Sequence, residues 1–167
     1  SDYALVTADK VSSAAKGNGY QPYDLLFMGD NGSNGASCEA ILPLLQDGKT
    51  TKGWGGSLFF VAAMWNNAMA TVTGLGAGTT ANNWSGMRCR PQLIEKFVSN
   101  AKTFLDKTTQ EIRAMGTDDR ALFWGKGTDS DKRTVELGDN SSFYQGLVTT
   151  KWNNNYSTGG TPHDSYD

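Results

Sequence analysis

Hydrophobic positions recur at helical spacing most clearly between residues 91 and 105. Pro91 suits a first helical position, where the backbone N–H that proline lacks is not needed. The apolar positions that would share one broad face are Leu93, Ile94, Phe97, Val98, Ala101, Phe104 and Leu105. The pattern therefore predicts one amphipathic helix over residues 91–105.

Two shorter helices are predicted from weaker patterns. The first covers residues 9–16 and ends at Gly17, and the second covers residues 108–115 and stops at Gly116. Glycine commonly follows the last helical residue because it adopts left-handed backbone angles without strain.

The remaining apolar runs favour β-strands. "ALFW", "RTVEL" and "FYQGLVTTKW" are separated by turns rich in Gly, Asp and Ser, which is typical of a hairpin or meander. "AILPLLQDG" carries Pro43 and predicts an edge or irregular strand. "LFFVAAM" (58–64) is apolar at every position, so periodicity alone does not separate strand from helix; we interpret it as a strand.

These elements predict an α+β fold: a loop-rich single domain over residues 1–167, with short antiparallel strands and one or two main helices. Residues 153–167 are expected to be a polar loop or tail. A chain of 167 residues is long enough for one hydrophobic core.

Composition narrows the classes of partner. The formal net charge is −2, so the chain lacks the basic surface that nucleic acid or an anionic membrane would require. Charged residues make up 19% of the chain and 20 residues are glycine, against averages of roughly 25% charged and roughly 7% glycine. Long ordered loops with neutral polar groups suit sugars better than phosphates.

Membrane and export signals are missing from the sequence. No apolar run reaches the ~18 residues of a membrane span, and no signal peptide is present. The chain begins without Met, and we interpret it as a mature form or an excised piece that is soluble by itself.

The two cysteines and the acidic residues leave alternatives open. Cys38 and Cys89 fit no zinc spacing, and they either pair in an oxidising compartment or lie apart as small buried side chains. The Asp30 loop departs from the EF-hand pattern. We expect no cofactor, with an irregular calcium site using Asp30, Asn31 or Glu39 as the alternative, while Asp129 and Asp131 fit a solvated hairpin tip.

Catalysis has few candidates. His163 is the single histidine and lies in a Gly/Pro-rich tail, which argues against a histidine-dependent triad or a multi-histidine metal site. A glycosidase needs only two carboxylates, roughly 5 to 10 Å apart, and Glu39 and Asp47 are the least ordinary acids because they flank an apolar run.

Three tryptophans have polar neighbours. Trp54, Trp65 and Trp84 lie beside Gly, Asn or Ser. An indole stacks on the C–H face of a pyranose and buries apolar area at little entropic cost. The full set of predicted ligand-binding residues, which adds amide and guanidinium hydrogen-bonding groups, is Trp54, Trp65, Asn66, Asn83, Trp84 and Arg88.

Each of these assignments has a structural alternative. The three indoles could instead hold long loops in place, and Arg88 and Arg90 could hold loop carbonyls or pair with acids. Trp124 and Trp152 end β-like runs, and we expect both to be structural.

Several stretches in order resemble one family. "ILPLLQDG", "GWGGSLFFVAAM", "NNWSGMRCRPQLIEKF", "GTDDRALFW" and "GLVTTKW" are similar to segments of the SusD/RagB family of outer-membrane glycan-binding lipoproteins. Trp84 to Arg88 resembles the W-x-G-x-R motif of that family, and Asp119-Arg120 resembles its D-x-R step. The resemblance spans roughly residues 3–152.

The resemblance implies a polysaccharide ligand, a cell-surface location at the outer membrane and an outer-membrane transporter as partner. Family members are about three times as long and carry a tetratricopeptide-like helical scaffold, which this chain lacks. We therefore interpret the chain as an excised module.

The leading hypothesis is non-catalytic polysaccharide binding on an aromatic platform, with plant hemicellulose such as xylan as the expected ligand. Affinity should be micromolar to millimolar because a shallow polar site offsets little of the ordering cost. The alternatives are a protein-interaction segment that docks to the transporter and, second, a glycoside hydrolase.

Overall fold

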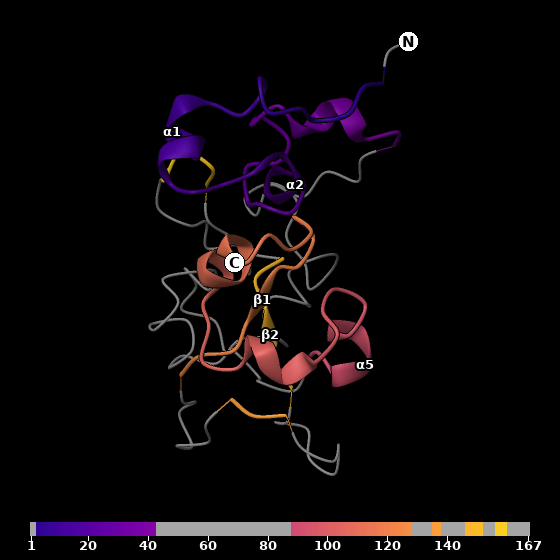
Figure 1. Cartoon of the computed structure of the whole chain (residues 1–167). Helices are drawn as coiled ribbons and strands as arrows, with labels where there is room; N and C mark the ends of the chain where they lie inside the picture. Colours follow the sequence, from indigo (N-terminus) through magenta and orange to yellow (C-terminus); the bar gives the residue numbers. More distant parts are fainter. Residues whose placement is uncertain (1–2, 43–87, 128–134, 138–145, 152–155, 160–167) are drawn as a thin grey trace, which may run out of the picture.

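The computed structural model describes residues 3–42, 88–127, 135–137, 146–151 and 156–159 of the chain. Across these residues, short helices and a two-stranded antiparallel sheet are joined by long loops. Figure 1 shows the N-terminal helices at one end, with the sheet and α5 towards the other. The predicted α+β, loop-rich fold class is confirmed.

The first helix, α1 (Ser13–Gly17), begins later than expected. The backbone N–H of Ala15 donates to the hydroxyl of Ser12, which makes Ser12 the N-cap. A serine hydroxyl at this position satisfies one of the N–H groups that a helix start leaves unpaired. The helix predicted over residues 9–16 is therefore confirmed only in its C-terminal half.

Helix α2 (Pro22–Leu25) and the 3-10 helix η1 (Ala36–Glu39) complete the N-terminal part. Asp24 accepts a hydrogen bond from the backbone N–H of Gln21 and so closes the first turn of α2. The residues that α1, α2, η1 and their flanking segments bury together form a first hydrophobic cluster: Val6, Val11, Ala15, Leu25, Met28 and Ala36.

The single helix predicted over residues 91–105 is wrong. The structure has α5 (Pro91–Ile94), a run of turns, and then the 3-10 helix η2 (Ala101–Phe104). Asn100 is extended, and its side chain accepts from the N–H of Lys102. Asparagine side chains compete in this way with helical hydrogen bonds and favour caps and turns, so the chain restarts at Asn100.

The apolar face of that segment is nevertheless largely correct. Ile94, Ala101 and Phe104 are at most 2% exposed, whereas Leu93 is 50% exposed. The break between α5 and η2 lets both short helices direct their apolar residues into one core.

Helix α6 (Thr109–Ala114) confirms the helix predicted over residues 108–115. The N–H of Glu111 donates to the Thr108 hydroxyl, and the Glu111 carboxylate accepts from the N–H of Thr108. This reciprocal capping box satisfies two N–H groups at the helix start. Gly116 follows with a φ of 76°, as expected after a helix.

Strands β1 (Phe123–Trp124) and β2 (Val148–Thr149) pair antiparallel, with Phe123 opposite Thr149 and Trp124 opposite Val148. They lie in the predicted "ALFW" and "FYQGLVTTKW" runs. No strand is assigned at residues 135–137, the described part of "RTVEL". The run at 58–64 lies outside the described residues.

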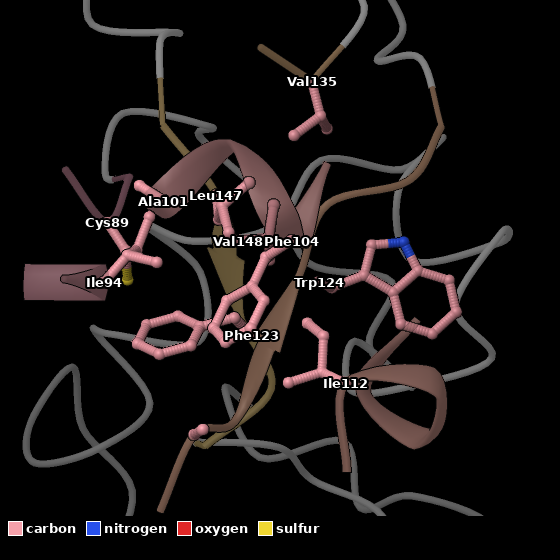
Figure 2. Close-up of a cluster of buried hydrophobic side chains, with 11 residues drawn as sticks. Cys89, Ile94, Ala101, Phe104, Ile112, Phe123, Trp124, Val135, Leu147 and Val148 are labelled. Atoms are coloured by element: carbon pink, nitrogen blue, oxygen red, sulfur yellow. The ribbon is translucent and has the colours of Figure 1, made fainter. Parts of the chain in front are cut away.

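The second hydrophobic cluster surrounds this sheet (Figure 2). Phe123 packs edge-on against Phe97, with ring centroids 5.3 Å apart. Trp124 is 6% exposed, and its indole N–H donates to the carbonyl of Lys126 at 2.7 Å. The structural role predicted for Trp124 is confirmed, whereas Trp152 lies outside the described residues.

Gly125 follows β1 at a point of close backbone contact. Its N–H donates to the carbonyl of Lys107, and its carbonyl accepts from Asp106. A Cβ placed on Gly125 would collide with the backbone carbonyl of Phe104. Only a residue without a side chain therefore fits between β1 and the segment that follows η2.

Threonine hydroxyls join α6 to the sheet inside this core. The Thr109 hydroxyl donates to the carbonyl of Phe123 at 2.8 Å and lies 3.0 Å from the Thr150 hydroxyl. The Thr149 hydroxyl donates to the carbonyl of Leu122 at 2.8 Å. Because all three threonines are buried, these bonds satisfy groups that would otherwise be costly to bury.

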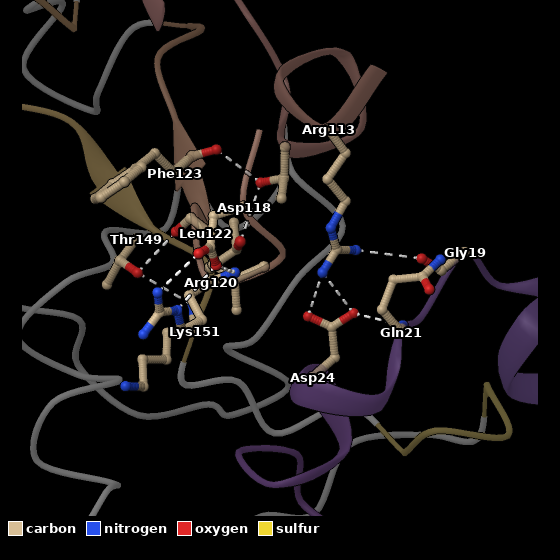
Figure 3. Close-up of polar contacts among 12 residues, drawn as sticks. Gly19, Gln21, Asp24, Arg113, Asp118, Arg120, Leu122, Phe123, Thr149 and Lys151 are labelled. Carbon is tan, nitrogen blue, oxygen red and sulfur yellow. Dashed lines mark hydrogen bonds and ion pairs between the residues drawn. The ribbon is translucent and has the colours of Figure 1, made fainter. Parts of the chain in front are cut away.

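An ion pair connects α2 to α6 (Figure 3). Nη2 of Arg113 donates to both carboxylate oxygens of Asp24, at 2.6 and 2.7 Å, and Nη1 donates to the carbonyl of Gly19. The two side chains are only 15% and 8% exposed. The pair therefore links the two hydrophobic clusters across a mostly water-excluded contact.

The segment at residues 156–159 is bound to the N-terminal part. The backbone N–H and hydroxyl of Ser157 both donate to Asp30, at 3.0 and 2.6 Å. The amide of Asn18 donates to the carbonyl of Ser157, and Ser157 is 3% exposed. Part of the stretch expected to be a polar loop or tail is thus packed into the structure.

Replacing Arg113 with Ala should lower the free energy of unfolding by about 3 kcal/mol, because it leaves the buried Asp24 carboxylate without its cation. Urea denaturation followed by tryptophan fluorescence measures this. Arg120→Ala removes an exposed ion pair and is the matched control, with an expected loss below about 1 kcal/mol. Equal losses in the two variants would contradict the coupling role of Asp24 and Arg113.

Candidate functional site

Most of the predicted sugar platform falls on residues 43–87. Five of the six predicted ligand-binding residues lie outside the described residues: Trp54, Trp65, Asn66, Asn83 and Trp84. The aromatic platform therefore stays a prediction. Four other residues considered from the sequence, Asp47, Asp129, Asp131 and His163, are also outside the described part of the chain.

Arg88, the sixth residue, begins the described segment and is half-buried. Its neighbour Cys89 forms an antiparallel bridge with Leu147, in which each N–H donates to the other carbonyl, at 2.7 and 2.9 Å. The chain that carries Arg88 is thus fixed against the segment that leads into β2.

Gly146 makes this contact possible. Its φ is +132°, and a Cβ placed there would lie 2.6 Å from the carbonyl oxygen of Cys89 and 2.8 Å from Cβ of Arg88. A residue with a side chain at position 146 would therefore push the chain that carries Arg88 away from the segment that leads into β2.

A second group of aromatic and charged residues lies on described elements, and we call it the cation–aromatic cluster: Tyr23, Phe27, Arg120 and Lys151. The rings of Tyr23 and Phe27 meet edge-on, with centroids 5.1 Å apart. Nζ of Lys151 lies 4.2 Å from the Phe27 centroid and 5.3 Å from the Tyr23 centroid. Such cation–π contacts contribute about 0.5–1 kcal/mol at exposed positions.

Asp118 fixes the orientation of the Arg120 side chain. The backbone N–H and Nε of Arg120 both donate to one oxygen of Asp118 at 2.9 Å, and Nη2 donates to the other at 2.7 Å. The side chains of Arg120 and Asp118 are 64% and 42% exposed. These hydrogen bonds lower the pKa of Asp118 to about 2, so its carboxylate is ionised at neutral pH.

Hydrogen bonds across the sheet join the segment that carries Lys151 to the segment that follows Arg120. The N–H of Lys151 donates to the Thr149 hydroxyl, which itself donates to the carbonyl of Leu122, two residues after Arg120 (Figure 3). The pKa of Arg120 is raised mainly by its hydrogen bond to Asp118 and next by the negative charge of that carboxylate.

The sequence patterns did not predict this cluster. One local signal was available, since Tyr23 and Phe27 are four residues apart after a helix-starting proline, which places two side chains on one face. The pairing with residues 120 and 151 depends on strand register and has no local signal. The sequence resemblance pointed to Asp119-Arg120, whereas the carboxylate that binds Arg120 belongs to Asp118.

The candidate acids of the N-terminal part bind other protein groups. The Glu39 carboxylate accepts from the backbone N–H of Val6. Asp30 accepts from Ser157 with one carboxylate oxygen and from the Asn34 amide with the other. Among the described residues, no group of three or more His, Cys, Asp or Glu side chains is arranged to hold a metal ion.

The two cysteines are free thiols, so the alternative in which they pair is wrong. Cys38 is half-exposed, and Nζ of Lys10 lies 3.4 Å from its sulfur. Cys89 is buried in the second hydrophobic cluster, and this burial raises its pKa to about 12. A thiol that stays protonated is a poor nucleophile, so Cys89 acts as a packing residue.

Within the part of the chain that the structure describes, no helix has the length and apolarity needed to cross a membrane.

Gly146→Ala should destabilise the protein by about 3 kcal/mol, because the new methyl group collides with backbone and the φ of Gly146 disfavours any side chain. Thermal or urea unfolding measures the loss. Gly17→Ala is the matched control, since a Cβ there meets nothing within 4 Å. An unchanged stability of Gly146→Ala would contradict the close contact with Cys89.

Arg120→Gln should raise the pKa of Asp118 from about 2 towards its ordinary value of 3.8. The ion pair is present above pH 3.8 and is lost as the pH falls through about 2, since the folded pKa lies below the unfolded one. An NMR titration of the side-chain carboxyl carbons measures the change. The pKa of Glu111, which is lowered by Thr108, should not move; an Asp118 pKa that stays near 2 in the variant would refute the assignment.

Comparison with known proteins gives an informative similarity. No family model matches the chain. The chain is 32% identical over 198 aligned residues to the starch-binding protein SusD of Bacteroides thetaiotaomicron, and the alignment covers 99% of this chain and 34% of that protein. The chain thus spans about a third of the length of that relative. Over nearly all of its own length, it is similar to part of a starch-binding protein.

Proposed function

We propose that this chain is a SusD-like module that binds polysaccharide without cleaving it. The observation that carries the proposal is the 32% identity, over 99% of the chain, to a protein described as starch-binding. The composition agrees with this function, because a weakly charged, glycine-rich chain provides neutral polar groups that can hydrogen-bond to sugar hydroxyls.

The proposed platform consists of the indoles of Trp54, Trp65 and Trp84. Pyranose rings would stack on them, with Asn66, Asn83 and Arg88 donating hydrogen bonds to sugar hydroxyls. The bridge between Cys89 and Leu147 supports the proposal, since it fixes the chain shortly after Trp84. A platform anchored in this way would lose less conformational entropy on binding.

Starch is the first ligand to test, because the relative is described as binding it. Xylan, the ligand expected from the sequence, remains the second choice within the proposal. In both polymers, binding would depend on stacking against neutral pyranose rings, so a single platform could accept either.

We also propose the longer protein and the cellular location in which this chain acts. The relative is about three times as long as the matched segment, so we infer that this chain acts as one module of a longer SusD/RagB-type protein. That protein would work at the outer membrane of the cell surface, beside a transporter that takes up the glycan.

Trp54→Ala, Trp65→Ala and Trp84→Ala should each weaken glycan binding roughly tenfold, which corresponds to about 1.4 kcal/mol. Affinity electrophoresis in gels containing starch or xylan measures the retention, and the triple variant should migrate as it does without polysaccharide. Tyr3→Ala removes an exposed aromatic side chain outside the platform and should leave retention unchanged.

The outcomes separate the competing functions. No retention by starch, xylan, β-glucan or pectin would end the binding proposal and favour a segment that docks to another protein. Release of reducing sugar during incubation with any of these polymers would instead indicate a glycoside hydrolase.

A further inference from the structure

We propose that Asn31 is a site of spontaneous deamidation, at which water converts the side-chain amide to a carboxylate. The sequence contains three Asn-Gly pairs, at residues 18–19, 31–32 and 34–35, and all three lie in the described part of the chain. Such pairs are open to this reaction because glycine has no side chain to shield the backbone nitrogen that attacks the amide. The folded structure separates the three pairs, and the inference does not depend on glycan binding.

The reaction needs only water. The backbone nitrogen of Gly32 loses its proton and forms a bond to Cγ of Asn31. The bond from Cγ to the side-chain nitrogen breaks, and that nitrogen takes up a proton and leaves as ammonia. Water then opens the resulting succinimide ring at either of its two carbonyls. One opening gives aspartate, and the other gives isoaspartate, in which the main chain runs through the former side chain.

The pair at residues 31–32 is open to this attack. Asn31 is exposed, and its side chain makes one hydrogen bond, from Nδ2 to the carbonyl of Leu26 at 3.1 Å. Gly32 is also exposed, and its N–H donates to no group within the described part of the chain. The attacking nitrogen can therefore lose its proton to solvent, and the amide gives up only one exposed hydrogen bond to reach it.

Hydrogen bonds hold the side chain of Asn34 at both ends. Its Nδ2 donates to the carbonyl of Leu25 at 2.9 Å and to Oδ1 of Asp30 at 3.1 Å. Its Oδ1 accepts from the N–H of Ala36 at 3.0 Å, and the residue is half-buried. Attack by Gly35 would have to turn the amide away from all three partners, and each lost hydrogen bond raises the barrier.

At the pair that follows α1, the attacking nitrogen itself is occupied. The N–H of Gly19 donates to the carbonyl of Lys16 at 3.0 Å, and Nδ2 of Asn18 donates to the carbonyl of Ser157 at 3.3 Å. Attack by Gly19 requires loss of the first bond, and departure of ammonia requires loss of the second. Asn18 and Gly19 are exposed, so hydrogen bonding and not burial distinguishes this pair from residues 31–32.

The product would lie in the loop that binds the segment at residues 156–159. Asp30, which precedes Asn31, accepts from the N–H and the hydroxyl of Ser157. Both products place a negative charge beside Asp30 and remove the donor to the Leu26 carbonyl, and isoaspartate also adds a carbon to the main chain. Conversion should therefore loosen the loop, and the amide proton of Ser157 should exchange faster with solvent.

The test follows the 167-residue chain during incubation in mildly alkaline buffer. Peptide mapping by mass spectrometry measures conversion at each pair, and electron-transfer fragmentation separates isoaspartate from aspartate. Asn31 should convert at least about tenfold faster than Asn18 and Asn34, because two or three hydrogen bonds protect those residues. Its rate should rise with pH, since the attacking nitrogen must be deprotonated. In urea, which removes the folded contacts, the three rates should become similar.

Gly32→Ala should slow conversion of Asn31 by roughly tenfold, because the added methyl group shields the attacking nitrogen. A Cβ at Gly32 meets nothing within 4 Å, so the variant should fold as the unmodified chain does. Gly17→Ala, where a Cβ also meets nothing within 4 Å, is the matched control and should leave the rate at Asn31 unchanged.

Two results would overturn the inference. The first is a rate at Asn18 or Asn34 in the folded chain that equals or exceeds the rate at Asn31. The second is a difference between the pairs that persists unchanged in urea, since neighbouring sequence and not the fold would then set the rates.

Discussion

The ion pair between Asp24 and Arg113 is the contact on which the arrangement of the two hydrophobic clusters depends. Among the described residues, neither cluster contains a long helix or a wide sheet. Removing two charges from water is costly, and the cost is recovered only where geometry is good and further hydrogen bonds are made. Here the carboxylate also closes the first turn of α2, and the guanidinium also binds the carbonyl of Gly19, so breaking the pair disturbs local structure on both sides.

Ser157 connects the segment at residues 156–159 to the N-terminal part, and its contacts do not involve Asp24 or Arg113. By binding Asp30 and Asn18, it brings a segment from near the C-terminus onto the loop that follows α2. Buried hydrogen bonds and one ion pair thus hold together segments that are far apart in the sequence. Such contacts can keep loops in a fixed position where helices and strands are short.

Local signals mark three helix starts: Pro91 at α5, Thr108 with Glu111 at α6, and Ser12 at α1. The prediction used Pro91, and it placed the first helix from residue 9, three residues before the Ser12 cap. The same reasoning failed for the stretch after Ile94, since Asn100 offers the backbone an alternative hydrogen bond that spacing alone does not reveal. The burial of Ile94 and Phe104 was still correct, because an apolar pattern survives a change in the path of the backbone.

The cation–aromatic cluster illustrates the opposite case. Its members come from positions 23, 27, 120 and 151, and the hydrogen bond from Thr149 to the carbonyl of Leu122 joins the strands beside Lys151 and Arg120. No rule based on spacing links residues that are about a hundred positions apart; strand register decides the contact. The predicted platform residues lie closer together in the sequence. Each of their tryptophans also has a polar neighbour, so the sequence alone suggests a binding site there.

Gly125 has an evolutionary consequence. No side chain fits against the Phe104 carbonyl. Selection should therefore remove substitutions of Gly125 wherever the same core is retained, whereas nearby surface positions can change. The glycine of "LFWG" then helps to align diverged sequences. A relative without it would need a different backbone contact between β1 and the segment that follows η2.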